Sequence, residues 1–215
     1  MLQADQFVLA DDVQYTTHSF INRVQIKTAR GAQWLTVPVL TRGRGVQIIK
    51  DVQIDSAQNW QRKQWRTLYH NYKLAPYFEH YADFFQTIYQ QKWNYLIDLN
   101  ISIIEFLKEM LHIPTPLELS SPLHLSSNAS LRLAEMVSQL NGTVYLSGPG
   151  GKKYLERSHF EQRGISIQYI SFSHPKYRQQ FGEFIPNLSV IDLLFNEGPL
   201  AATILNNVPI ELESG

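Results

Sequence analysis

Residues 143–173 constrain the fold most, because two apolar runs there are separated by a glycine-rich turn and a polar segment. The runs "TVYLS" and "ISIQYISFS" are short and rich in Val, Ile and Tyr, which is typical of buried strands. The polar segment "GGKKYLERSHFEQRG" between them is a helix or two short turns that end at Gly164. A connection of this length is a crossover between parallel strands rather than a hairpin. We therefore expect a parallel βαβ part in the C-terminal half.

The first 55 residues contain four further strand-like runs. These are "QFVLA", "INRVQIKT", "QWLTVPVL" and "IIKDVQID", all short, partly alternating and rich in β-branched residues. The segment "TRGRG" separates the third run from the fourth and reads as a hairpin loop. Together the four runs predict a mostly antiparallel N-terminal sheet.

The middle of the chain has helical spacing of its apolar residues. Residues 56–75, 77–91 and 94–111 each place Trp, Phe, Tyr, Leu or Ile on one side, which we interpret as core packing. A Pro- and Ser-rich connection follows, "HIPTPLELSSPLHLSSN", with room for one short strand, "PLELS". The fold class is therefore α/β, with an antiparallel N-terminal sheet, a helical middle and a C-terminal βαβ part.

The C-terminal half adds a helix at 128–140, capped by Asn128, and two closing helices in "SVIDLLFNEG" and "PLAATILNN". Residues 208–215 read as a tail. We predict one domain over 1–215, with a subdivision into 1–115 and 116–207.

Composition excludes several classes of protein. Nineteen basic residues balance nineteen acidic ones, so no nucleic-acid partner is expected. The chain has no cysteine, which removes disulfides, thiolate metal sites and a thiol nucleophile. The N-terminus is acidic and resembles no signal peptide, and no apolar run is long enough to span a membrane. These features fit a cytoplasmic protein, and they indicate no particular cofactor.

The turn "SGPGG" follows the strand "TVYLS" and precedes the polar segment. Ligands of open parallel sheets bind beyond the carboxyl ends of the strands, and glycines there let backbone N–H groups approach an anion. The spacing matches neither the P-loop nor the dinucleotide fingerprint, since Leu146 and Lys153 stand where glycine or a hydroxyl residue is required. The turn thus binds a phosphate or carboxylate, or it is only a tight connection.

Two short polar segments near the N-terminus are further candidates. Asp11 and Asp12 could bind a metal, orient an amine or cap a turn. Asn22 and Arg23 follow, and the guanidinium of Arg23 could bind a carboxylate or phosphate through two hydrogen bonds, or pair with one of the two aspartates.

His174 is the most suggestive of the seven histidines, because it ends the strand "ISIQYISFS" and precedes Pro175. A histidine there can act as a general base, and Asp192 could orient it. The alternative is a structural His174, with Asp192 favouring the start of its own helix. No HExxH or similar spacing is present, so we assign no metal ligand.

Several blocks in this order and spacing resemble the WbqC-like family. They are "FVLADDVQYTTHSFINRVQIKT", "WLTVPV", "WRTLYHNYKLAPYF", "DLNISII", "TVYLSGPGGKKYL" and "FSHPKYRQQFGEFIPNLSVIDLLFNEG". The resemblance covers nearly the whole chain, from about Phe7 to Leu205. It implies a cytoplasmic enzyme encoded among genes for bacterial surface polysaccharide such as O-antigen, a transferase that acts on an activated or amino sugar.

The resemblance also suggests the site. His174 and Asp192 are the expected catalytic pair. The expected substrate-binding residues are Asp11, Asp12, Asn22, Arg23, Ser147, Gly148, Gly150, Gly151, Tyr154, Tyr177, Asn187 and Ser189. Family members usually carry a further segment of the type Gln-Pro-x-x-x-Pro-Trp-x-Gly-Tyr-Phe before the first strand, which this sequence lacks. We therefore expect an exposed apolar surface near Leu9, Val13 and Phe20, and a homo-oligomer that covers it.

These features predict N-acyl or aminoacyl transfer to an amino sugar or sugar nucleotide, with an activated donor. His174 would be the base, and the "SGPGG" turn would hold an anionic group. One alternative is a glycosyltransferase with a metal–diphosphate site at Asp11 and Asp12. The other is a non-catalytic binding or scaffold protein.

Overall fold

The computed structural model describes residues 1–215, which fall into two compact units. The sheet unit comprises residues 1–11, 115–173 and 207–215, and the helix unit comprises residues 12–114 and 174–206. One crossing of the chain between them lies beside the predicted boundary at 115/116. The chain also crosses at 11/12, 173/174 and 206/207, and the last of these lies beside the predicted start of the tail at residue 208. The predicted subdivision stays a prediction.

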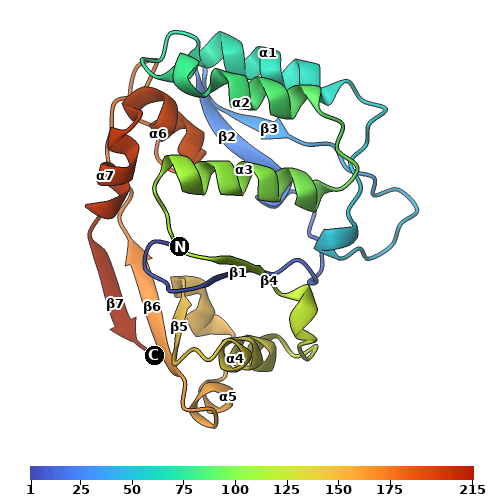
Figure 1. The fold of residues 1–215 in the computed structure, drawn as a ribbon, viewed down its shortest axis with the longest axis vertical. Helices are drawn as coiled ribbons and strands as arrows, with labels where there is room; N and C mark the ends of the chain where they lie inside the picture. Colours follow the sequence, from blue (N-terminus) through green and yellow to red (C-terminus); the bar gives the residue numbers. More distant parts are fainter. The chain divides into compact units, whose positions relative to one another are not determined.

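The helix unit contains a hairpin and five helices (Figure 1). Its elements are β2 (Arg23–Thr28), β3 (Gly31–Thr36), the 3₁₀ turn η1 (Ile49–Asp51), α1 (Trp60–Tyr72), α2 (Phe78–Gln90), α3 (Leu96–Met110), α6 (Val190–Glu197) and α7 (Leu200–Asn206). Strands β2 and β3 are antiparallel, as expected, and Arg23 pairs with Thr36. Figure 1 shows α1 and α2 packed side by side, and in this view the hairpin is drawn between α2 and α3.

The core of the helix unit is aromatic, as the helical spacing predicts. Phe195 of α6 is fully buried, and its ring lies 5.1 to 6.4 Å, between centroids, from four other rings. These four belong to Tyr72, Phe78, Tyr81 and Phe85 of α1 and α2. Helices far apart in the sequence are thus joined by one apolar cluster, which holds α6 against α1 and α2.

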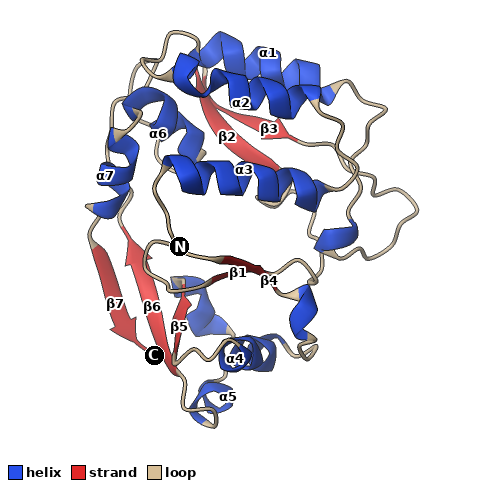
Figure 2. Cartoon of the chain, viewed as in Figure 1, coloured by secondary structure: helices blue, strands red, loops and turns tan.

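The sheet unit contains the predicted βαβ part (Figure 2). Its elements are β1 (Phe7–Leu9), β4 (Leu117–Leu119), the 3₁₀ turn η2 (Ser121–Leu123), α4 (Ala129–Gln139), β5 (Val144–Ser147), the 3₁₀ helix η3 (Pro149–Lys153), α5 (Arg157–Glu161), β6 (Ser166–Phe172) and β7 (Ile210–Ser214). Strands β5 and β6 are parallel, with Ser147 opposite Tyr169. The crossover consists of η3 and α5, the two-turn version of the prediction, and Asn128 caps α4 through its side chain.

Three sequence-based expectations about strands are wrong. Residues 48–55 form no continuous strand, because the 3₁₀ turn η1 interrupts them and the N–H of Val52 donates to the Ile49 carbonyl. Only isolated antiparallel bridges remain there, such as that between Ile54 and Val39. Strand β1 leaves the antiparallel sheet and pairs in parallel with β4. The predicted tail contains strand β7, in which apolar and polar residues alternate. This strand pairs antiparallel with β6.

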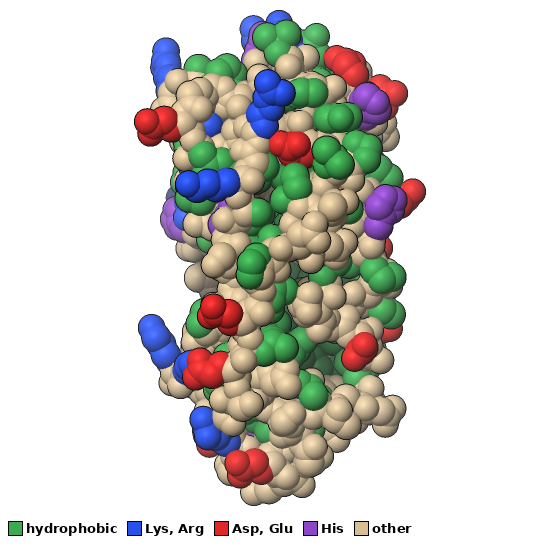
Figure 3. All heavy atoms as spheres, turned by 90° about the vertical axis from the view of Figure 1, so that its left-hand side faces the viewer, with side chains coloured by type: hydrophobic (Ala, Val, Ile, Leu, Met, Phe, Trp, Pro, Cys, Tyr) green, Lys and Arg blue, Asp and Glu red, His purple; other side chains and the backbone are tan.

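The surface agrees with the balanced charge of the sequence. On the face shown in Figure 3, Lys and Arg side chains are scattered among acidic ones and form no continuous stripe. None of the helices combines the length and the apolar character that crossing a membrane requires. Of the residues expected near an exposed apolar surface, Phe20 is 72% exposed, whereas Leu9 and Val13 are half-buried. A homo-oligomer stays a prediction.

Candidate functional site

A buried polar network surrounds Asp192 in the helix unit. Asp192 lies in the first turn of α6, and its side chain has no exposed surface. Tyr72 of α1 donates its hydroxyl to Oδ1 at 2.7 Å, and Tyr177 donates to Oδ2 at 2.9 Å. Asn196, one turn further along α6, donates to the backbone carbonyl of Asp192 at 2.7 Å. The buried carboxylate of α6 thus binds both helix α1, through Tyr72, and the loop that contains Tyr177.

Lys27 brings the β2 strand into the same network. Only 1% of Lys27 is exposed, which is rare for a lysine. Its backbone N–H donates to the Tyr72 hydroxyl at 2.9 Å. Its Nζ donates to Oε1 of Gln179 at 3.0 Å and to the carbonyl of Glu183. The side-chain amide of Gln179 donates to the carbonyl of Ile185 and accepts from its N–H. Lys27 thus anchors the loop that precedes α6.

Burial sets the protonation of the network. Desolvation raises the pKa of Asp192 above its ordinary value, while the hydrogen bonds from Tyr72 and Tyr177 and the charge of Lys27 pull it down in part. Desolvation and the neighbouring Asp192 carboxylate also raise the pKa of Tyr72 and of Tyr177. Both phenols therefore keep their protons and act as hydrogen-bond donors at neutral pH.

The raised pKa of Asp192 predicts an unusual pH dependence. Folded Asp192 holds its proton at higher pH than the unfolded chain does, so its contribution to stability is complete below the ordinary value of 3.8. That contribution declines as pH rises from there through the folded-state pKa, by at most about 1.4 kcal/mol per pH unit. We expect the stability advantage of wild type over Asp192→Asn to shrink from pH 4 upward in urea titrations. An advantage that grows with pH would contradict this assignment.

His174 lies beside this network. Its Nδ1 is 2.9 Å from the carbonyl of Pro175, and its ring centroid is 6.1 Å from that of Tyr177 and 5.7 Å from that of Phe184. The side chain is half-buried. Both oxygens of Asp192 receive phenolic hydrogen bonds, and one of these comes from Tyr177, the neighbour of His174. The catalytic pairing of His174 with Asp192 stays a prediction.

Asn187 and Ser189 lie just before α6. Ser189 is the N-cap residue of α6, but its side chain makes no capping hydrogen bond. Its backbone N–H instead donates to the carbonyl of Gln25 at 2.8 Å, which ties the start of α6 to β2. Asn187 has a positive φ of 59° and turns the chain toward the helix. The two residues therefore position α6, whatever else they contact.

Asn22 and Arg23 precede and begin β2. Asn22 is 8% exposed, and its Nδ2 donates to the carbonyl of Val37 at 2.9 Å, while its buried Oδ1 has no hydrogen-bond partner. The guanidinium of Arg23 lies 4.1 Å from the ring centroid of Trp34 and donates to the carbonyl of His18. The Nε of Arg23 is also buried without a partner. Leaving such a group unsatisfied costs about 1–3 kcal/mol, so these two atoms are unusual.

In the sheet unit, the "SGPGG" turn leads from β5 into η3. The hydroxyl of Ser147, which is buried, donates to the carbonyl of Gly148 at 3.0 Å. The same carbonyl accepts from the N–H of Gly151 at 3.0 Å. Tyr154 ends η3 with 54% of its surface exposed. The turn is thus held by its own hydrogen bonds, and anion binding by it stays a prediction.

Gly151 is required by close packing. A Cβ added there would lie 2.1 Å from Oγ of Ser147 and 3.0 Å from a methyl group of Leu155. We expect Gly151→Ala to destabilise the protein by about 1–3 kcal/mol, since overpacking must displace these groups. Gly150→Ala is the matched control, because a Cβ there meets nothing within 4 Å. Equal unfolding midpoints for the two variants in urea would refute the packing argument.

Asp11 and Asp12 fall on opposite sides of a unit boundary. Asp11 is 3% exposed, and its Oδ1 accepts from the backbone N–H of Ser121 at 2.8 Å and from the hydroxyl of Ser120 at 3.2 Å. Asp11 therefore caps the turn η2, which is the structural interpretation that the sequence left open. The structure gathers no group of three or more His, Asp or Glu side chains that could hold a metal ion.

The structure brings His174, Tyr177 and Asp192 close together and adds Lys27, Tyr72 and Gln179, which the sequence analysis missed. Tyr72 could have been found, because it continues the buried stripe of Trp60, Gln64 and Leu68 at intervals of four. Lys27 carries no such signal, since it lies in an ordinary strand and contacts a loop about 150 residues away.

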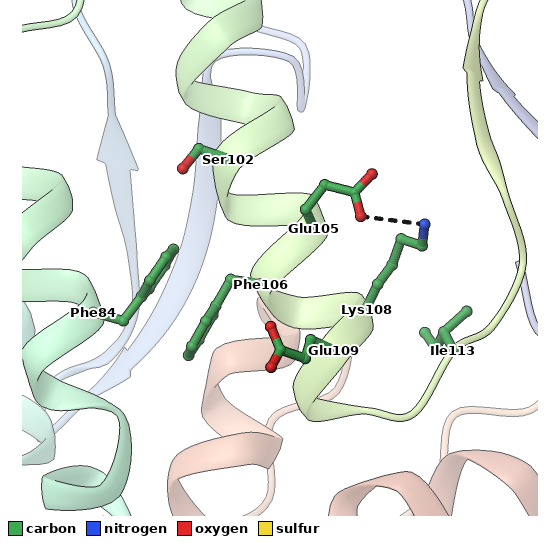
Figure 4. A pocket seen from close by; sticks show the side chains of 7 residues that line it. All are labelled: Phe84, Ser102, Glu105, Phe106, Lys108, Glu109 and Ile113. Atoms are coloured by element: carbon green, nitrogen blue, oxygen red, sulfur yellow. Dashed lines mark hydrogen bonds and ion pairs between the residues drawn. The ribbon is translucent and has the colours of Figure 1, made fainter.

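A separate open hollow of about 450 Å³ lies beside α2 and α3 (Figure 4). It is lined by Phe84, Ser102, Glu105, Phe106, Lys108, Glu109 and Ile113. The rings of Phe84 and Phe106 stack at 3.6 Å between centroids, and Lys108 pairs with Glu105 at 3.3 Å. None of the predicted site residues lines it, so the hollow is not part of the candidate site.

Comparison with known proteins agrees with the resemblance. No solved structure matches the chain. A protein of Mycobacterium tuberculosis (strain ATCC 25618 / H37Rv), described as uncharacterized protein Rv1507c, is 36% identical over 203 residues, covering 94% of this chain and 87% of its own length. The sequence pattern of the WbqC-like protein family matches residues 1–204. The chain belongs to the WbqC-like family.

Proposed function

We propose that the protein is a transferase in the assembly of bacterial surface polysaccharide, and that it moves an acyl or aminoacyl group to the amine of an amino sugar or its nucleotide. One observation carries this proposal. A half-buried histidine, His174, lies beside a phenol, Tyr177, that is anchored on a buried carboxylate. Such an arrangement supports a general base held in one orientation. Family membership supports the polysaccharide context.

The tautomer of His174 follows from its contact with Pro175. A carbonyl oxygen can only accept, so Nδ1 carries the hydrogen and donates to it, and the lone pair is on Nε2. Nε2 would take a proton from the acceptor amine while the nitrogen of that amine attacks the acyl carbon of the donor. The leaving thiol or alcohol of the donor would then receive that proton. Asp192 is a positioning residue here, because its Oδ2 accepts the hydrogen bond of Tyr177, whose ring lies beside His174.

The experiment is a transfer assay on the purified chain. Sugar nucleotides that bear a free amine are combined with acyl thioester and aminoacyl donors, and products are identified by mass spectrometry. Matched sugars with a hydroxyl in place of the amine are the control. We expect the mass of the acyl group to appear only on an amino sugar. Glycosyl transfer, or no acyl product from any pair, would refute the proposal.

A further inference from the structure

An exposed aromatic pair lies next to Arg23 in the helix unit. Phe20 is 72% exposed and Trp34 is 38% exposed. Their ring centroids are 5.6 Å apart, with the planes tilted by 49°. The guanidinium of Arg23 lies 4.1 Å from the Trp34 centroid. Two apolar faces and one cation thus share a small surface, which we call the Trp34 platform, formed by Phe20, Arg23 and Trp34.

The hairpin and a fixed turn build this platform. In the β2–β3 register Gln25 lies opposite Trp34, so Arg23, two residues before Gln25, is a diagonal neighbour of Trp34 on the same face. The turn before β2 is closed by Ser19, whose hydroxyl donates to the carbonyl of Thr16 at 2.7 Å. Arg23 also donates to the carbonyl of His18 in this turn. Phe20 is therefore presented to solvent by backbone that is tied at several points.

The charge on the platform is not neutralised within the protein. Arg23 makes no ion pair, whereas Lys152, which also lies near an aromatic ring, pairs with Glu213 at 2.6 Å. The guanidinium donates to the carbonyl of His18, which carries no net charge. Its Nε is buried, so a ligand on the surface would contact its terminal nitrogens. Arg23 therefore has no anionic partner within the chain.

A ligand that fits the Trp34 platform would have a flat ring to contact the aromatic side chains and a phosphate to contact the guanidinium. A guanidinium binds phosphate oxygens through two parallel hydrogen bonds, and aromatic side chains stack on nucleobases whatever their sequence. We propose that the Trp34 platform binds the nucleoside diphosphate part of a sugar nucleotide, with the base against Phe20 and Trp34 and a phosphate on Arg23. This inference rests on the sugar-nucleotide substrate of the proposed function and names the residues that recognise it.

A nucleic acid strand fits the same surface less well. Proteins that bind single strands add a basic groove that follows the backbone. Here basic and acidic residues are equal in number, and Arg23 is the one cation on the platform. One guanidinium and two rings suit one nucleotide.

The test is a binding titration on the full chain without turnover. The probes are UDP, dTDP, CDP, GDP and ADP, and for the nucleotide that binds best also the free nucleoside and inorganic pyrophosphate. We expect the nucleotide to bind at least about tenfold more tightly than the free nucleoside and than inorganic pyrophosphate. Arg23→Lys should weaken the nucleotide and pyrophosphate but not the nucleoside. Phe20→Ser, at an exposed position, should weaken the nucleotide and nucleoside but not pyrophosphate. Arg66→Lys, on the exposed side of α1, is the control.

The outcomes separate this inference from the proposed function. No binding of any of the five nucleotides up to about 1 mM overturns the inference. So does acyl transfer to a sugar nucleotide with wild-type KM in both Phe20→Ser and Arg23→Lys, although the proposed function then stands. Tight nucleotide binding that both variants weaken, without any acyl transfer, supports the platform and refutes the transferase. A preference for a single-stranded oligonucleotide over every nucleotide also overturns the inference.

Discussion

Lys27→Met is expected to lower the free energy of unfolding by about 3–5 kcal/mol, the range for removing one partner from a buried charged network. Methionine has a similar length and leaves no large cavity, so the loss comes from polar groups. Nζ of Lys27 donates to Gln179 and to the carbonyl of Glu183, and its charge favours the Asp192 carboxylate. Without Lys27, the Glu183 carbonyl loses this donor and Asp192 loses its compensating cation. Urea unfolding followed by circular dichroism measures the effect.

Lys63→Met is the matched control, because Lys63 is exposed on α1 of the same unit. A surface change of this kind should alter stability by no more than about 0.5 kcal/mol. The double variant Lys27→Met with Asp192→Asn removes both charges. We expect it to lose less stability than the sum of the two single losses, because each single variant leaves the other charge uncompensated. A loss below about 1 kcal/mol for Lys27→Met would show that the buried cation is not important to the fold.

Local patterns were sufficient to predict most of the helices. Phe78, Tyr81, Phe85 and Ile88 repeat at helical spacing, and all four are buried on α2. The parallel pair β5–β6 also followed from the sequence, since two strands joined by a crossover are close in the chain. Where a partner is distant, the same patterns gave the wrong sheet. β1 pairs with β4 more than 100 residues later, and no local signal identifies that partner.

The candidate site shows the same division. His174 and Asp192 were chosen from a strand end and a helix start, which local sequence reveals. Their actual connection through Tyr177 depends on side-chain directions that spacing does not determine. Lys27 and Tyr72 enter because folding brings β2 and α1 against α6. The sequence thus identified two residues at or beside this network, and tertiary packing decided which other groups are buried with them.

His174→Gln is expected to reduce kcat of the proposed transfer by about 10²–10⁴-fold, the usual contribution of a general base. Glutamine can still donate to the Pro175 carbonyl, and the side chain is half-buried, so stability should change little. The acid limb of the pH–rate profile should disappear as well, because it reports protonation of the base. His70→Gln, at an exposed position on α1, is the control, and it should keep both the wild-type kcat and the acid limb of the profile.

Tyr177→Phe distinguishes a positioning role from a purely structural one. It removes the phenolic hydrogen bond to Asp192 but leaves a ring beside His174. If Tyr177 orients the base, kcat should fall by less than in His174→Gln, while KM stays the same and the acid limb persists. If His174 is only structural, His174→Gln should instead lower the unfolding free energy and leave kcat per folded molecule unchanged. The ratio of kcat to folded fraction, measured on the same samples, decides between these roles.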